Sequence, residues 1–270
     1  MLHNFLYVVL GLLALVALIS IGFAIPPRPF RPHPAPSQPG EPQPLRPGLP
    51  EPVRRHFVET IGETPRTVKT AVVWGRGRRH IRGVWVPLRF KAWYRPGEAY
   101  TRRMEVTWFQ RPVMRGRDAW KNGTGFYEMG DKVEQGEEID QSQALAMWAD
   151  AVWMPSLLVH ESPIGWDPVD ENMARLVIPD GRGGSQSLLA YFDPINGRMT
   201  HLSGKRYSIS TGEQEPWRVD LLTWKQLNGL LIPDQTSVAW GESGSPLWFW
   251  SVDGVAYNVN VTDQLGSFES

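Results

Sequence analysis

Two pairs of carboxylates are the residues of this sequence that could most readily do chemistry. Asp167 and Asp170 flank Pro168, and Asp118 and Glu128 lie in two segments expected to pair across a tight turn. Two close carboxylates can acquire different pKa values and act as acid and base. However, Asp167-Pro168 is also typical of a turn and Asp170 of a helix cap. The four carboxylates are therefore the candidates for a hydrolase, and the pattern singles out no catalytic residue.

The other motifs that could bind a cofactor or act as a nucleophile are incomplete. Gly75-Arg76-Gly77 begins like a dinucleotide fingerprint, but His80 stands in place of the third glycine and no helix is expected after it. Gly241-Glu242-Ser243-Gly244-Ser245 lacks the last glycine of a nucleophile elbow. Cysteine is absent and the six histidines show no paired spacing. We expect no metal and no cofactor, and an enzyme is the less favoured class.

Composition narrows the possible partners. Lys plus Arg and Asp plus Glu each total 28, so the chain has no net charge, which disfavours a nucleic-acid partner. The 13 tryptophans are typical of an aromatic core or of a surface that binds amphiphiles. The densest basic cluster could face anionic lipid head groups, although such a cluster is usually a solvated loop and strand edge. It comprises Arg76, Arg78, Arg79 and Arg82.

One clearly amphipathic helix is predicted in the second half of the chain, over Asp140 to Pro155. Its apolar residues recur at helical spacing and form a broad stripe, which should pack against a sheet. Asp140 or Ser142 can cap its start, and Pro155 ends it. The stripe leaves Gln143, Ala146 and Asp150 as the solvent edge.

The N-terminal region predicts an anchor followed by a spacer. Phe5 to Ile25 is an uncharged run of 21 residues, long enough as a helix to cross a bilayer. A cleaved signal peptide is the alternative. Pro26 to Pro52 holds 12 of the 24 prolines and favours a stiff polyproline II tether. Arg28 and Arg31 would place the chain after the span in the cytoplasm, but the spacer favours an extracytoplasmic domain on a single-pass membrane protein, which we expect here.

After a short helix over Glu51 to Thr60, the apolar period changes to two, which predicts many short strands. Asn122-Gly123, Asn228-Gly229 and Asp253-Gly254 are hairpin signals. The expected fold is mainly β with α, a curved antiparallel sheet or half-barrel with the central helix on its concave face. The domains expected are residues 1–25 as the membrane anchor or signal peptide, 26–50 as the Pro-rich linker and 51–270 as the β-rich globular domain. The expected strands are Thr67–Trp74, Ile81–Val86, Arg89–Tyr94, Arg103–Phe109, Val113–Trp120, Thr124–Met129, Ala174–Ile178, Ser187–Phe192, Arg198–Leu202, Lys205–Ile209, Trp217–Lys225, Val238–Trp240, Leu247–Val252 and Val255–Val261.

An ordered set of short motifs resembles an uncharacterised bacterial family, a domain of unknown function, over about Leu49 to Val259. Because that family has no assigned activity, the resemblance implies no catalytic residue. The order of elements is also similar to the LolA/LolB lipoprotein-carrier superfamily, which implies a half-barrel that holds acyl chains, although fold alone does not fix function. The motifs are Trp85-Val86-Pro87-Leu88-Arg89-Phe90-Lys91-Ala92, Asp118 with Asn122-Gly123-Thr124-Gly125, Trp153-Met154-Pro155-Ser156-Leu157-Leu158 with Trp166, Arg206-Tyr207, Pro216-Trp217, Gly229 with Ile232-Pro233, and Val238-Ala239-Trp240.

The leading functional hypothesis is a membrane-tethered binding module. An apolar or amphipathic ligand, such as a lipid, an acyl chain or a lipoprotein, would lie between the concave sheet and the central helix. Trp108, Trp148 and Trp153 are the candidate ligand-binding residues, although a tryptophan in such a position is more often plain core. The alternatives are a non-catalytic envelope scaffold with a packed interior and, third, the carboxylate-based hydrolase.

Overall fold

The computed structural model describes residues 2–160, 163–179 and 184–266. The helices are α1 Leu2–Ala24, α2 Glu51–Ile61, α3 Glu137–Ala149 and α4 Thr262–Gly266, with two 3₁₀ helices, η1 Asp150–Trp153 and η2 Pro155–Leu158. The strands are β1 Ala71–Ile81, β2 Val84–Arg95, β3 Ala99–Trp108, β4 Arg111–Lys121, β5 Thr124–Met129, β6 Lys132–Glu134, β7 Gly165–Asp170, β8 Met173–Pro179, β9 Ser185–Phe192, β10 Met199–Ser208, β11 Glu213–Leu227, β12 Leu230–Trp240 and β13 Pro246–Tyr257.

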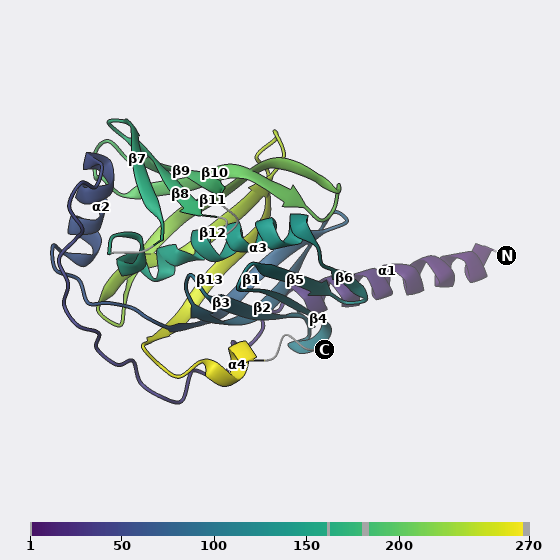
Figure 1. Cartoon of the computed structure of the whole chain (residues 1–270). Coiled ribbons are helices and arrows are strands. Elements are labelled where there is room, and N and C mark those ends of the chain that lie inside the picture. The colour runs from purple at the N-terminus through teal and green to yellow at the C-terminus, as the bar shows by residue number, and fades with distance from the viewer. Residues whose placement is uncertain (1, 161–162, 180–183, 267–270) are drawn as a thin grey trace.

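All of these strands belong to one antiparallel sheet that is built from two meanders. The chain enters at the centre with β1 and proceeds strand by strand to β6 at one edge. It then crosses to β7 at the other edge and returns strand by strand to β13, which pairs with β1. The edge strands β6 and β7 are not neighbours in the strand order of the described residues, so the sheet is curved and open (Figure 1). The predicted fold class is confirmed.

Alternation along the strands gives the sheet a large buried concave face. In β2, Phe90, Ala92 and Tyr94 are fully buried in the main core, whereas Trp93 packs in a small separate cluster with α4 on the convex side. Residues two apart share a face of a strand, so this periodicity separates the two layers. The core lies between the sheet and α3.

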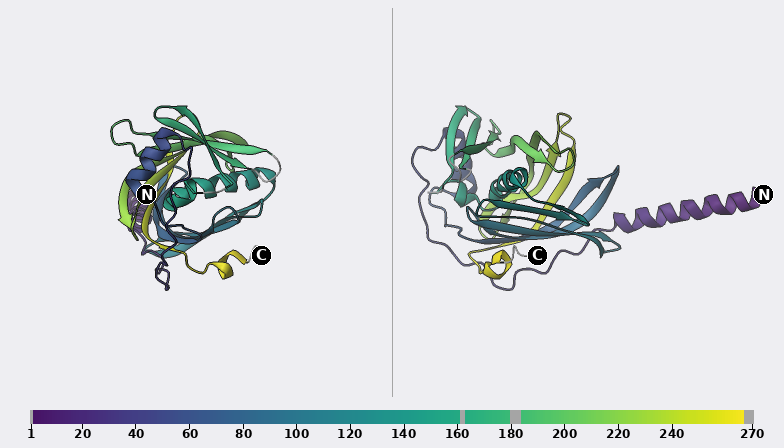
Figure 2. Two further views of the ribbon diagram at one scale, coloured as in Figure 1. Left: turned by 60° about the vertical axis from the view of Figure 1, so that its left-hand side comes forward. Right: turned by 45° about the vertical axis from the view of Figure 1, so that its right-hand side comes forward.

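Helix α3 is the crossing segment, and it lies inside the curve of the sheet (Figure 2). It ends at Ala149, six residues before the predicted end at Pro155, because the chain tightens into η1 at Asp150 and Pro155 starts η2. The predicted side-chain caps were wrong: Gly136 is the N-cap and no side chain caps it. Asp140 instead accepts a hydrogen bond from the Gly125 amide, and Ser142 contacts β10.

Two of the three expected hairpins are confirmed. Asn122 and Gly123 both have positive φ between β4 and β5, as do Asn228 and Gly229 between β11 and β12. This matches the turn type that favours Asn-Gly. A further hairpin at Arg82 and Gly83 splits the segment that the sequence predicts as the strand Ile81–Val86.

The Asp253-Gly254 hairpin was wrong, because both residues lie inside the single long strand β13. Gly254 pairs with Trp74 and Val252 with Gly75, so Asp253 is the extra residue of a β-bulge. A side chain at Gly254 would collide with the Trp74 ring, since a Cβ there would stand 2.3 Å from it. The glycine thus permits close packing and does not mark a turn.

The N-terminal helix α1 projects from one end of the sheet (Figure 2). It is long and apolar enough to cross a membrane, and a signal sequence would fit the same description. The Pro-rich tract that follows runs along the outside of the sheet to α2 (Figure 1). Amides of this tract bond to the folded part, from Gln38 to the Tyr257 carbonyl at 2.9 Å and from Arg46 to the Val159 carbonyl at 3.0 Å. The tract therefore lies against the domain and does not stand away from it as a free spacer.

Candidate functional site

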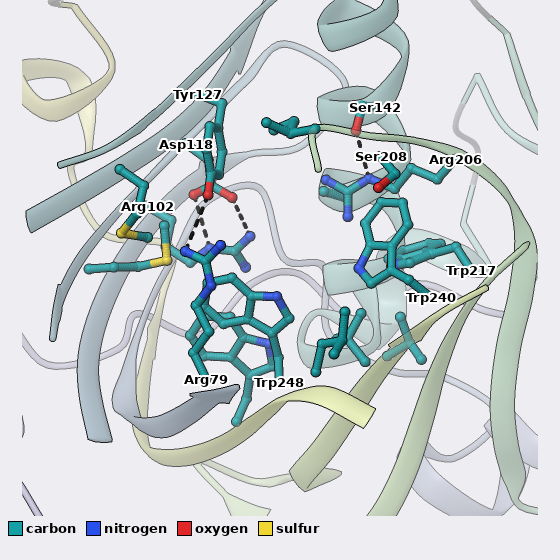
Figure 3. A pocket seen from close by; sticks show the side chains of 18 of the residues that line it. Arg79, Arg102, Asp118, Tyr127, Ser142, Arg206, Ser208, Trp217, Trp240 and Trp248 are labelled. Atoms are coloured by element: carbon teal, nitrogen blue, oxygen red, sulfur yellow. Dashed lines mark hydrogen bonds and ion pairs between the residues drawn. The ribbon is translucent and has the colours of Figure 1, made fainter. Parts of the chain in front are cut away.

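A cavity of about 560 Å³ lies between the concave sheet and the α3–η1 segment. This volume is within the range of roughly 300–1,000 Å³ that small-molecule sites occupy. Its wall is apolar over the tryptophans and methionines and charged where several arginines enter it (Figure 3). The apolar lining includes Met104, Met114, Met129, Trp153, Trp217, Val219, Val238, Trp240, Trp248 and Trp250.

A buried ion cluster occupies one wall of the cavity. The pairing of β3 with β4 sets Arg102 directly opposite Asp118, and both side chains are less than a tenth exposed. The Arg102 guanidinium donates through Nε to Asp118 Oδ1 at 3.0 Å, and through Nη2 to Oδ2. Its Nη1 donates to Asp150 Oδ2 at 3.0 Å, which ties the sheet to the end of α3. One arginine therefore satisfies two carboxylates from different parts of the chain.

The charges in this cluster alter one another's pKa. Desolvation alone would lower the pKa of Arg102, but the charges of Asp118 and Asp150 outweigh it and raise the pKa well above its usual value. Burial raises the pKa of Asp150 to about 6, against the opposing effects of Arg102 and of the Tyr94 hydroxyl that donates to it. The Asp150 carboxylate therefore titrates about two pH units closer to neutrality than an ordinary aspartate.

Arg206 enters the cavity from β10, on the opposite wall. Its guanidinium carbon lies 4.8 Å from the Trp217 ring centre and 5.2 Å from that of Trp240, two residues that are directly paired across β11 and β12. Its Nε donates to Ser142 Oγ of α3 at 2.9 Å (Figure 3). The side chain therefore contacts both an aromatic wall and the helix while it faces the cavity.

The aromatic wall continues on β13, where Trp248 and Trp250 stack at 5.1 Å. Arg79 lies 4.4 Å above the Trp248 ring, and its Nη1 donates to the Tyr127 hydroxyl at 3.4 Å. Stacking of guanidinium groups on indole rings is favourable and keeps both groups ordered. Of the predicted basic cluster, Arg79 and Arg82 line the cavity, and Arg76 forms an ion pair with Asp253.

The three candidate tryptophans occupy different places. Trp153 lines the cavity and donates from Nε1 to the Pro233 carbonyl at 3.1 Å. Trp148 is buried in the core and is not among the cavity-lining residues. Trp108 lies at the end of β3 and donates to the Ile19 carbonyl of α1 at 3.3 Å, so it contacts the N-terminal helix.

The four candidate carboxylates do not come together. Asp118 lines the cavity, but Glu128 pairs with Arg117 and so sits one position away from Tyr127, the partner of Asp118. Neighbouring residues on a strand point to opposite faces. Asp167 and Asp170 are exposed on the edge strand β7. The suggested turn at Asp167-Pro168 was wrong, since both residues belong to that strand.

The residues that the sequence placed on a solvent edge of the helix lie beneath the sheet instead. Gln143 is fully buried and accepts a hydrogen bond from the Tyr100 hydroxyl at 2.6 Å. Ala146 and Asp150 line the cavity. The prediction was wrong because the sheet curls around α3 and encloses its polar side too, where Arg102 and Arg206 provide partners.

Arg102 and Arg206 were not predicted to line the cavity, because a charged residue within a strand ordinarily lies on its solvent-exposed face. One signal was available: Arg206, Trp217 and Trp240 all lie in the motifs that carry the family resemblance. In residues 2–160, 163–179 and 184–266, no three His, Asp or Glu side chains are grouped as a metal site. The polar wall is built from guanidinium, carboxylate, hydroxyl and indole groups.

The comparisons with known proteins give the chain a family. A model described as a family of unknown function, DUF6544, matches residues 41–252. The chain belongs to this family. The resemblance to an uncharacterised family is thereby confirmed. No curated protein matches the chain.

Two solved structures show a distant likeness of fold. A DUF1329 family protein from Desulfovibrio piger is 12% identical, with a TM-score of 0.42, over 78% of this chain and 92% of its own. A LolA superfamily protein from Nitrosomonas europaea is 12% identical, with a TM-score of 0.43, over 79% of this chain and 95% of its own. A LolA-like structure is thus among the matches, as the order of elements in the sequence suggested.

Proposed function

We propose that this DUF6544 protein is a membrane-tethered binding module that holds an apolar or amphipathic ligand between the curved sheet and α3. The single observation that carries the proposal is the cavity of about 560 Å³ and its wall of tryptophan and methionine side chains. Such walls adapt to flexible apolar molecules, because the methionine side chain is unbranched and polarisable. A lipid or a single acyl chain is the ligand class that this lining favours.

The cavity also favours the binding module over the two alternatives, the scaffold and the hydrolase. A scaffold was expected to have a fully packed interior, and open space among tryptophan rings argues against that expectation. A hydrolase built on the four candidate carboxylates needs two of them in one cleft, and Asp118 alone among them lines this cavity. The geometry therefore favours binding.

The tether in this proposal is α1, and the domain is proposed to lie outside the cytoplasm. Helix α1 is exposed along most of its length, and its apolar side chains would be covered by lipid. A C-terminal fusion to a reporter that is active only outside the cytoplasm should be active. Activity of a cytoplasm-specific reporter at the same position would show that the domain lies in the cytoplasm.

Ligand binding can be tested by filling the cavity. Full-length protein in nanodiscs should bind a fluorescent fatty acid, detected by energy transfer from the tryptophans that line the cavity. Ala146→Phe places a ring into the cavity from α3 and should weaken binding at least tenfold, as should Val238→Trp from the facing sheet. Thr124→Phe, on the exposed side of β5, is the matched control and should bind like the parent. Equal binding by all four proteins, each shown to be folded by circular dichroism, would contradict the proposed site.

A further inference from the structure

The cavity-lining guanidinium of Arg206 has no carboxylate partner among the residues that the structure describes. It contacts Ser142 Oγ at 2.9 Å, Gln143 Oε1 at 3.5 Å and the two indole rings. None of the ion pairs among the described residues includes it. Burial lowers the pKa of Arg206, although an arginine keeps its proton at neutral pH. A cation removed from water is costly unless an anion pairs with it.

Two further hydrogen-bond donors around Arg206 also lack an acceptor. Trp217 is only 3% exposed, and its buried indole Nε1 has no hydrogen-bond partner among the described residues. The amide Nε2 of Gln143 is likewise unbonded, while its Oε1 accepts from Tyr100 and Arg206. Buried donors are nearly always paired, so unbonded donors gathered at one site indicate that an acceptor is missing. Both donors belong to residues in direct contact with the Arg206 guanidinium.

The acidic groups of the cavity do not supply that acceptor. Asp118 and Asp150 are both engaged by Arg102, and neither lies within ion-pair distance of Arg206 among the described contacts. Across the cavity, Arg79 is likewise without a carboxylate partner in the described part of the chain, and it rests on Trp248. The whole lining holds five Lys and Arg side chains against two carboxylates. The charge balance of the wall therefore favours an anion.

Resting on the proposed function, we infer that the ligand is an anionic amphiphile whose oxyanion head group binds the cavity-lining residues Arg206 and Trp217. Guanidinium groups bind carboxylate and phosphate oxygens through paired hydrogen bonds, and these are stronger than neutral ones. The indole N–H of Trp217 adds a directed donor to the same head group. The apolar body of the ligand lies against the methionine and tryptophan wall. The head group is a carboxylate or a phosphate monoester.

The test compares three photoreactive amphiphiles with the same 12-carbon chain and different head groups: a carboxylate, a phosphate and an uncharged hydroxyl. Full-length protein is held in phosphatidylcholine nanodiscs, and mass spectrometry quantifies cross-links to cavity-lining peptides. Arg206→Met is the test variant, and Trp217→Phe removes one N–H while it keeps the ring. Arg115→Met is the matched control, because Arg115 is 80% exposed and does not line the cavity.

We expect a carboxylate or phosphate head to reach half-saturation at a concentration roughly ten- to a hundredfold lower than the hydroxyl head. Arg206→Met should abolish this preference, Trp217→Phe should reduce it several-fold, and Arg115→Met should keep it. The anion with the stronger preference identifies the head group.

The remaining outcomes separate the two proposals. If all three amphiphiles saturate alike, or if Arg206→Met keeps the preference, the anion site is overturned while the binding module stands. If none of the amphiphiles cross-links to the cavity, the result contradicts both the binding module and the anion site.

Discussion

Two regions beneath the sheet differ in how they hold buried polar groups: the closed end, where α2 packs into the core around His56, and the open end, which is the cavity lined by Arg102 and Arg206. At the closed end, α2 buries His56 among Phe57, Phe192 and Trp224. His56 Nδ1 accepts the Met199 amide at 3.1 Å, and burial lowers its pKa to about 3, so the ring is neutral. At the open end, Arg102 and Arg206 keep their charges inside the cavity.

This difference indicates what each end does. At the closed end the buried His56 ring is neutral and its Nδ1 is bonded, and packing there serves stability. The open end holds more cations than carboxylates around a cavity, an arrangement that a ligand of opposite charge would stabilise. The contrast can be tested by replacing the titratable or charged residues at each end and measuring the free energy of unfolding.

Arg102→Met should produce the largest loss. It leaves Asp118 and Asp150 buried without a counter-ion, and breaking a buried pair in this way typically costs about 3–5 kcal/mol. Urea unfolding of the full-length protein measures the change. Arg115→Met, which removes only an exposed arginine 3.6 Å from Glu105, should cost less than about 1 kcal/mol. A similar small value for both variants would mean that the ion cluster does not support the fold.

His56 should make the closed end sensitive to acid. Its folded pKa of about 3 lies below the ordinary 6.5, so the unfolded chain binds the proton first. Stability from His56 is present above pH 6.5 and is lost as the pH falls toward 3, by up to about 1.4 kcal/mol per pH unit. His56→Gln removes the titration and can still accept the Met199 amide. The stability advantage of the parent over this variant should shrink on acidification, and an advantage that is independent of pH would be inconsistent with a buried neutral histidine.

Asp150 should give the open end a smaller dependence of opposite sign. Its folded pKa of about 6 lies above the ordinary 3.8, so the folded protein binds the proton more tightly. Its contribution is most favourable below pH 3.8 and is lost as the pH rises through 6. Relative to Asp150→Asn, the parent should gain stability as the pH falls from 6 to 4. A relative loss over that interval would show that Arg102 dominates the titration.

Arg206→Met should have the smallest effect on stability, below about 1 kcal/mol. Unlike Arg102, Arg206 leaves no carboxylate unpaired when it is removed, and methionine can fill the gap between Trp217 and Trp240. The same urea titrations measure it. A loss as large as that of Arg102→Met would assign Arg206 a structural role.

The sequence predicts the secondary structure of the molecule better than its polar interior. The period of two, the Asn-Gly turns and the broad apolar helix each depend on local sequence, and the sheet, both turns and the helix are present. The hairpin predicted at Asp253-Gly254 was wrong because β-bulges and hairpin turns favour the same residue types. The close approach of Trp74 to Gly254, which distinguishes the two, is not visible in the sequence.

The cavity charges could not be predicted because they depend on register and on distant partners. Arg102 meets Asp118 through the β3–β4 register, and meets Asp150 only because α3 crosses the concave face. Trp153 was found because it falls on the broad apolar stripe of the predicted helix. Trp108 follows the apolar alternation of its strand but lies where the strand meets α1, which no local pattern shows.

The most direct test of the ligand cavity is native mass spectrometry of the full-length protein, purified from its own membranes and released gently from detergent. We expect a population that carries one tightly held amphiphile, identified after extraction, which Ala146→Phe removes and Thr124→Phe keeps. A bare polypeptide mass in all three proteins, together with no uptake of added acyl chains, would contradict it.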